Sequence, residues 1–359
     1  MIGKETMKKV LTKLKRKKAE PQAPSRITNE TVAEHREKIL AGGRKFKYPH
    51  QYVRHKLVIT ALAIAAITLL ILGIIGWWQL YVVQNTSEFM YRLTRVVAVP
   101  VASVDGEQVR YSDYLMRYRS QELWLTTKGQ MNLKDADGER QLGYIKRNVL
   151  DGVIADAYAA KQARALGVSV NGQDVQLVID SNRNTATGRI SQEVYDASTK
   201  DTLGYSPDEY KQIIKQSLIR QRVAYAVDTT ADKLQKEIAA KIAASPTGSL
   251  KALADSYAAT APTVAYGASG LVQKNNQDGG LSQTALGLKD NEVSKAFRST
   301  TGDGYYFIRR ISQNDRQVNY EFIVVKLTVF DEQVAKLKKS GKVKEYISVK
   351  EVKQQNGKG

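Results

Sequence analysis

The chain has 359 residues, of which 42% are hydrophobic and 25% charged, and its formal net charge is +19. This composition is that of a folded protein with room for two or three domains. The sequence contains no cysteine, and its three histidines all lie within the first 55 residues. Disulfides and thiolate sites are therefore excluded, and so is imidazole chemistry after His55.

The basic residues are concentrated at the N-terminus, where residues 1–56 hold 16 Lys/Arg and 5 Asp/Glu. Residues 8–18 set apolar side chains among lysines, as a helix on an anionic membrane surface does, although a disordered basic tail that only fixes topology is the favoured interpretation. Nucleic acid is an unlikely partner because no recognised binding motif accompanies the charge. We expect one further helix at 29–40, ended by Gly42-Gly43.

A transmembrane helix follows the basic tail. Residues 57–76 form a run of twenty residues without a charge, enough at 1.5 Å per residue to cross a hydrocarbon core of about 30 Å. Trp77, Trp78 and Tyr81 suit an interfacial aromatic belt, and the basic flank places the N-terminus in the cytoplasm. We predict an uncleaved signal anchor in the cell membrane, with the C-terminal domains extracytoplasmic. A cleaved signal peptide is the alternative, but the tail and the apolar run are both longer than such peptides use.

Residues 98–228 carry the signals of a mostly helical unit. A tight turn at Asp105-Gly106 precedes a helix that we expect to be capped at Ser112. A long amphipathic helix stops at Gly167, and Asn171 is expected to cap the next one. The segment SPDE places Pro207 in the first turn of another helix.

Two strands are predicted near the C-terminus. The segment GDGYYFIRRI at 302–311 is a turn followed by a strand, and VNYEFIVVKLTVF at 318–330 is a second one. The intervening SQNDRQ predicts an antiparallel hairpin. A basic helix at 331–339 and a short strand, VKEYISV, complete the pattern.

The order of these signals resembles a known family. The stretches VASVDGEQVRYSDYL, LDGVIADAYAAKQARALGVSVNGQDVQ and LGYSPDEYKQIIKQSLIRQRV are similar to the N-terminal chaperone domain of SurA-type and PrsA-type extracytoplasmic folding factors. Residues 250–311 resemble a parvulin-type prolyl isomerase domain, from a helix end at Leu250–Tyr257 to a last strand at Gly304–Ile308. The resemblance implies a helical chaperone domain followed by a small domain with a four-stranded antiparallel sheet.

The chain departs from the parvulin pattern at the residues that carry its chemistry. The family has a histidine after Gly-Tyr in its last strand, where this chain has Tyr306. Its first-strand histidine has no counterpart, unless 318–330 replaces that strand as in a permuted domain, with Phe322 at the histidine position. Catalytic residues, a metal site and cofactors are accordingly predicted as none. Candidates for a client-binding pocket are Phe297, Tyr306, Phe307 and Phe322, for which core packing is the alternative role.

The predicted fold class is α+β. The predicted domains are a cytoplasmic basic tail (1–56), a transmembrane signal-anchor helix (57–78), a juxtamembrane linker (79–97), a SurA-N-like helical domain (98–228), a degenerate parvulin-like domain (229–330) and a C-terminal helix with a basic tail (331–359).

Three functions fit these predictions. The first is a membrane-anchored chaperone or foldase-like protein that binds unfolded or secreted polypeptide clients, with lipid contacts through the transmembrane helix and basic tail. The second is an active parvulin-type peptidyl-prolyl cis-trans isomerase, and the third is a non-catalytic envelope scaffold protein. A missing base disfavours the second, while binding needs only apolar grooves.

Overall fold

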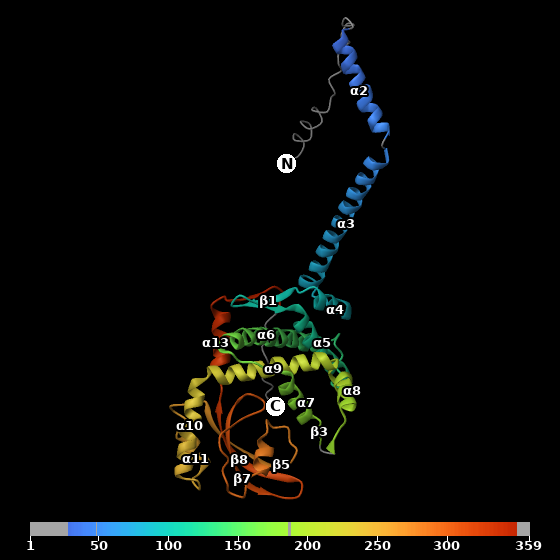
Figure 1. Ribbon diagram of the computed structural model, residues 1–359. Helices are drawn as coiled ribbons and strands as arrows, with labels where there is room; N and C mark the ends of the chain where they lie inside the picture. Colours follow the sequence, from blue (N-terminus) through green and yellow to red (C-terminus); the bar gives the residue numbers. More distant parts are fainter. Residues whose placement is uncertain (1–27, 48, 186–187, 350–359) are drawn as a thin grey trace. The chain divides into compact units, whose positions relative to one another are not determined.

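A computed structural model describes residues 28–47, 49–185 and 188–349, and the predicted basic helix at 8–18 lies outside them. The chain divides into two compact units, residues 1–76 and 77–359. Figure 1 shows the elements of each unit in sequence colours. Each unit is described by itself below.

The described residues of the first unit are almost entirely helical. It contains α2 (Asn29–Lys47) and most of α3 (Pro49–Tyr81). The described residues contain one helix, His55–Tyr81, that is long and apolar enough to cross a membrane, and its most apolar stretch is entirely exposed. The predicted end of α2 at Gly42-Gly43 is wrong: neither glycine has a positive φ, and the helix continues to Lys47. Glycine in a helix costs only about 1 kcal/mol relative to alanine, which does not force a stop.

The second unit begins with a short helix in place of the predicted juxtamembrane linker. Helix α4 (Glu88–Val96) starts at Ser87, whose side chain accepts a hydrogen bond from the Met90 amide. Leu80, Met90 and Tyr91 belong to the main hydrophobic core. The segment 79–97 is thus part of the folded unit.

The helical part of the second unit starts from a hairpin and continues through five helices. Asp105 and Gly106, both with positive φ, make the predicted turn of the hairpin. The elements of this helical part are β1 (Pro100–Val104), β2 (Glu107–Arg110), α5 (Tyr111–Thr127), α6 (Ala136–Leu166), α7 (Gly172–Asn182), the small hairpin β3 (Asn184–Thr185) and β4 (Gly188–Arg189), α8 (Gln192–Leu203) and α9 (Pro207–Val227).

Most predicted helix ends are confirmed. Gly167 ends α6 with a φ of 68°, and Asn171 caps α7 through a reciprocal box with Asp174. Ser206 caps α9 with Pro207 in its first turn. Ser112 is not a cap, because α5 begins one residue earlier and Ser112 is buried.

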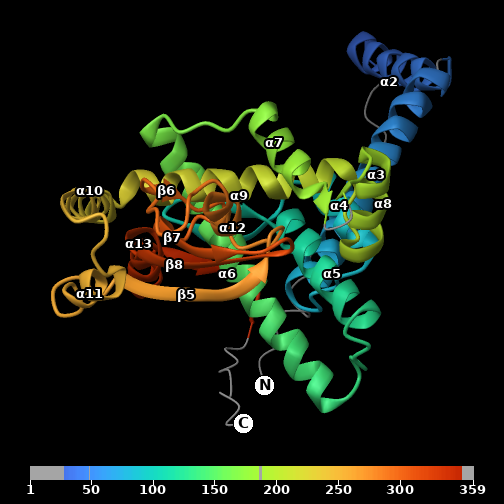
Figure 2. The same cartoon turned by 90° about the horizontal axis from the view of Figure 1, so that it is seen from below.

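The C-terminal part is a sheet with helices on both faces. Its elements are α10 (Thr229–Ala244), α11 (Leu250–Asp255), β5 (Val264–Gln273), α12 (Leu281–Leu286), β6 (Phe297–Arg298), β7 (Gly304–Gln313) and β8 (Gln317–Lys326). The antiparallel strands are ordered β5-β8-β7-β6, so β8, the last of these four in the sequence, lies between β5 and β7 (Figure 2). The predicted hairpin between the two strands is confirmed.

The alternation of side chains along β7 divides the packing between the two faces of this sheet. Tyr305 and Phe307 pack with residues of α10 and α11 in one cluster. Tyr306 and Ile308 pack with Leu281 of α12 in another.

The C-terminal segment returns to the helical part instead of forming a separate helix and tail. Helix α13 (Val329–Lys339) contributes Phe330 and Val334 to the main core, and β9 (Val343–Glu345) pairs with β1. Ion pairs from Arg147 to Glu345 at 2.6 Å and from Lys338 to Asp151 at 2.7 Å fix this return to α6. Of the predicted domain 331–359, residues 331–349 therefore complete the helical part, and 350–359 lie outside the described residues.

Candidate functional site

An open groove of about 440 Å³ is bordered by α5, α6 and the segment that leads through Tyr205 into α9. Its floor is apolar, since Leu125, Ile145 and Val149 are buried side chains of the main core. Trp124 stands at its edge and is 45% exposed. A ligand that enters this groove would therefore lose contact with water and gain contact with an aromatic wall and an aliphatic floor.

Amide side chains form part of the rim of the groove. Gln121 and Asn148 are exposed and Gln141 is half-buried. Their side-chain amides make no hydrogen bond to any other residue in the described parts of the chain. Each amide has donors and an acceptor for a polypeptide backbone.

The charge at the base of the groove is neutralised within the protein. Arg117, which lines the groove, is paired with the buried carboxylate of Asp156 and donates from Nη2 to Gln216 Oε1 at 2.8 Å. Arg220 Nη1 lies 3.2 Å from the other oxygen of Asp156. The groove thus offers apolar surface and neutral amides more than free charge.

Nearby, α5 and α9 are also joined by a half-buried carboxyl group. Asp113 accepts hydrogen bonds from Gln212 at 2.9 Å and from Gln216 at 3.2 Å. Burial raises the pKa of Asp113, and the neighbouring Arg110 and Arg117 only partly oppose this effect. These contacts hold two walls of the groove at a fixed separation.

Three of the four predicted pocket residues come together on one face of the C-terminal sheet. The Tyr306 ring centroid lies 6.1 Å from that of Phe297 and 5.6 Å from that of Phe322. Phe322 covers Gly267 on β5, where a Cβ atom would approach Phe322 Cζ to 2.3 Å. Glycine at this position is what allows the Phe322 ring to lie flat across the strand pair.

Phe307 is not brought together with the other three. It is adjacent to Tyr306 in β7 and therefore points to the opposite face, where it is 1% exposed and packs in the α10–α11 cluster. This position leaves Phe307 a core residue.

The phenol of Tyr306 is hydrogen-bonded within the protein. Tyr306 donates to Asp303 Oδ2 at 2.6 Å, and burial followed by this hydrogen bond raises the pKa of Tyr306. Burial alone would raise the pKa of Asp303, but hydrogen bonds from Ser299, Tyr306 and Thr301 lower it. Tyr306 is therefore a neutral phenol with its proton committed to Asp303, which makes it a poor general base.

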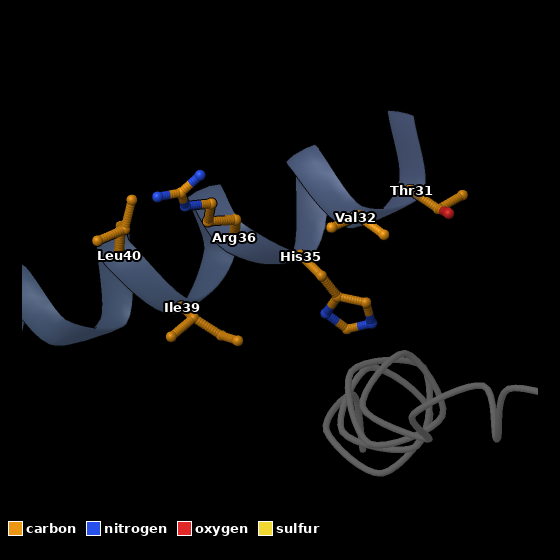
Figure 3. Close-up of a pocket in the computed structure, with 6 residues that line it drawn as sticks. All are labelled: Thr31, Val32, His35, Arg36, Ile39 and Leu40. Atoms are coloured by element: carbon orange, nitrogen blue, oxygen red, sulfur yellow. The ribbon is translucent and has the colours of Figure 1, made fainter. Parts of the chain in front are cut away.

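Neither a metal site nor the hollow on α2 adds a second candidate. Among the described residues, no group of three or more His, Cys, Asp or Glu side chains could hold a metal ion. Figure 3 shows Val32, His35 and Ile39 projecting from α2. The labelled residues around this hollow all come from one helix, and Val32 and Ile39 are 52% and 70% exposed, so it is an open helix face.

An open apolar groove with unused amides at its rim is typical of proteins that bind other chains. The comparison with known families agrees with this class. Residues 50–224 match the family model of the SurA-like N-terminal domain, which supports a SurA-like, chaperone-type family for this chain. Domains of this kind in general bind unfolded client polypeptides.

The match covers the groove and leaves out the C-terminal sheet. The elements α5, α6 and most of α9 lie within residues 50–224, whereas the sheet with Phe297, Tyr306 and Phe322 follows them. No curated protein matches the chain.

Sequence reasoning missed this groove. The signal that could have found it is the amides Gln121, Gln141 and Asn148 flanking apolar positions on two successive helices.

Proposed function

We propose that this protein is a membrane-anchored extracytoplasmic chaperone that binds unfolded or secreted polypeptides in the groove between α5, α6 and α9. The observation that carries the proposal is the position of this groove inside the segment that matches the SurA-like N-terminal domain. The helix His55–Tyr81 is the proposed anchor, with the basic N-terminus in the cytoplasm and the second unit outside the membrane.

The chemistry of the groove suits segments of many sequences. Its apolar floor and Trp124 favour any large apolar side chain, while amide groups can pair with the main chain of whatever segment enters. Since Arg117 is already paired with Asp156, selection by charge is weak. A chaperone needs this combination because its clients share exposed apolar side chains and unpaired backbone.

Replacing Trp124 by serine is expected to weaken client binding by about tenfold with the fold retained, because aromatic anchors in grooves carry much of the binding free energy. The full-length protein in lipid nanodiscs would be mixed with a denatured client, and the concentration that halves client aggregation would be measured. Leu177→Ser on α7 is the matched control, since Leu177 is 62% exposed and does not line the groove.

The control should retain the activity of the unchanged protein. If Trp124→Ser and Leu177→Ser suppress aggregation equally well, the groove is not the binding site. If the unchanged protein suppresses no aggregation, a scaffold that holds one specific envelope partner becomes the better proposal.

For the C-terminal sheet, we propose that β8 takes the place of the opening strand of a parvulin-like domain. The support is its position between β5 and β7 and the contact of Phe322 with Tyr306. With aromatic rings at both histidine positions and the Tyr306 phenol bound to Asp303, this face is proposed to hold apolar client segments without isomerising them.

In a protease-coupled assay on a proline-containing peptide, the full-length protein is therefore expected to leave the cis-to-trans rate at its uncatalysed value. The physical reason is that the Tyr306 phenol, which stands at the histidine position, is already hydrogen-bonded to Asp303 and is not free to act on the X-Pro bond. Tyr306→Phe should leave the rate unchanged too, with an active parvulin as the positive control. Acceleration that disappears in Tyr306→Phe would instead support the isomerase.

A further inference from the structure

Five apolar residues are exposed on α4, at its end and in the segment that joins α3 to it, and we call them the α4 surface. Val96 is 85% exposed and Phe89 67%, and Val82, Val83 and Val97 are each about half exposed. Phe89, Arg92 and Val96 fall on one side of the helix at a spacing of three and four residues. Large apolar side chains exposed together at a surface indicate that a partner covers them.

The opposite side of α4 packs on the helical core, and this packing defines the direction in which the α4 surface faces. Met90, Tyr91 and Thr94 are buried. The Tyr91 hydroxyl donates to Glu209 on α9, and Arg95 Nη1 lies 3.1 Å from the same carboxylate. Rotation of α4 to hide Phe89 would break these contacts.

The chain between α3 and α4 is also fixed. The Tyr111 hydroxyl donates to the Leu80 carbonyl at 2.6 Å, and the Tyr81 hydroxyl donates to the Pro100 carbonyl at 2.7 Å. The Asn85 amide donates to the Gln79 carbonyl at 2.9 Å. The chain has therefore turned back beside the last turn of α3 before α4 begins (Figure 1).

This turn returns the chain to the level of Gln79 three residues before α4 starts. Gln79 lies two residues before the end of the apolar helix, a rise of about 3 Å. Trp77 and Trp78 precede it directly and are 57% and 48% exposed. Aromatic residues at this end of a membrane span lie in the headgroup region, and Asn85, three residues before α4, is hydrogen-bonded to Gln79 directly after them.

We propose that the α4 surface lies in the interfacial layer of the lipid bilayer, with Phe89, Val96 and the neighbouring valines inserted among the headgroups. The proposal rests on the proposed membrane anchor. Lipid is the occupant because the surface continues the apolar helix His55–Tyr81 at the level of its aromatic end. Arg92 pairs with Glu88 at 2.7 Å but keeps 77% of its side chain exposed, and it lies between the two apolar residues, where anionic headgroups can reach it. The contact would hold the client groove at a fixed orientation to the membrane.

The absence of cysteine from the sequence allows a direct test. Phe89→Cys and Val96→Cys, each labelled with an environment-sensitive fluorophore, would be placed in full-length protein in phosphatidylcholine–phosphatidylglycerol vesicles. The vesicles would carry a nitroxide either near the top or near the end of the acyl chain. Leu177→Cys is the water-exposed control and Ala66→Cys the control within the apolar helix.

Quenching of the labels at 89 and 96 by the shallow nitroxide is expected to exceed that at 177 about threefold. If 89 and 96 are quenched no more than 177 while 66 is quenched by the deep nitroxide, the anchor stands and the α4 proposal is overturned. If 66 is not quenched, the anchor itself fails. A blue shift at 89 and 96 without quenching would mean contact with another protein chain, which also overturns the proposal.

Discussion

Replacing Arg309 by methionine is expected to lower the free energy of unfolding of the C-terminal sheet by about 3 kcal/mol. Arg309 is a buried residue of β7, and its Nη1 lies 3.0 Å from Glu321 Oε1 on β8. Its Nη2 donates to the carbonyls of Pro246 and Gly248 at 3.0 and 2.7 Å. Methionine occupies a similar path but makes none of these contacts. The substitution leaves a largely buried carboxylate without its cation and two carbonyls without a donor.

Hydrogen–deuterium exchange of the full-length protein in detergent micelles would measure this loss. Protection of the β7 and β8 amides should fall by about 100-fold, since each 1.4 kcal/mol is a factor of ten. Amides of α6 should keep their protection, because α6 belongs to the other hydrophobic core.

A double substitution separates the lost cation from the lost packing. The Tyr266 hydroxyl donates to Glu321 Oε2 at 2.8 Å, and glutamine at 321 can keep that contact without a charge. The double variant Arg309→Met with Glu321→Gln should therefore be about tenfold better protected than Arg309→Met alone. Equal or poorer protection in the double variant would mean that the unpaired carboxylate is not the source of the instability.

Local signals predicted much of this fold. Asn171, Ser206 and Gly167 mark helix ends through contacts within four residues, so sequence spacing alone carries the information. The hairpin of β7 and β8 was predictable for the same reason, because its turn lies between its strands.

Contacts between distant segments were not predictable from such signals. Strand β9 pairs with β1 across more than two hundred residues, and nothing in VKEYISV identifies its partner. Helix α4 was not predictable for the same reason, because the burial of Tyr91 depends on α4 packing against α5 and on its bond to Glu209 on α9.

The candidate site likewise has a part that local signals could predict and a part that depends on contacts between distant segments. The alternation of a strand already separates Phe307 from Tyr306, so the error in grouping them was avoidable. The neighbourhood of Phe297, Tyr306 and Phe322, by contrast, depends on which strands lie side by side. The α5–α6–α9 groove depends on helix packing and has no sequence signature beyond the composition of its rim.

Replacing Asp228 by alanine is expected to cost about 3 kcal/mol where the helical part and the C-terminal sheet are joined. Asp228 is 2% exposed. Its Oδ1 accepts from the Ala231 amide at 2.9 Å and caps α10, while its Oδ2 accepts from the Thr328 and Val329 amides at 2.9 and 3.3 Å. One carboxylate thus joins the α9–α10 junction to the start of α13, and its removal leaves three amides without an acceptor.

The loss should appear as about 100-fold faster exchange of amides in 229–234 and 328–336 of the full-length protein. Asp228→Asn should give an intermediate rate, because its one amide oxygen can serve Ala231 or the α13 amides but not both. Asp232→Ala is the matched control: Asp232 lies in the same first turn of α10 but makes an exposed pair with Lys236 at 2.7 Å, which contributes little. If Asp228→Ala exchanges no faster than Asp232→Ala, the two parts are held together by apolar packing alone, and the carboxylate is not what fixes the return of α13.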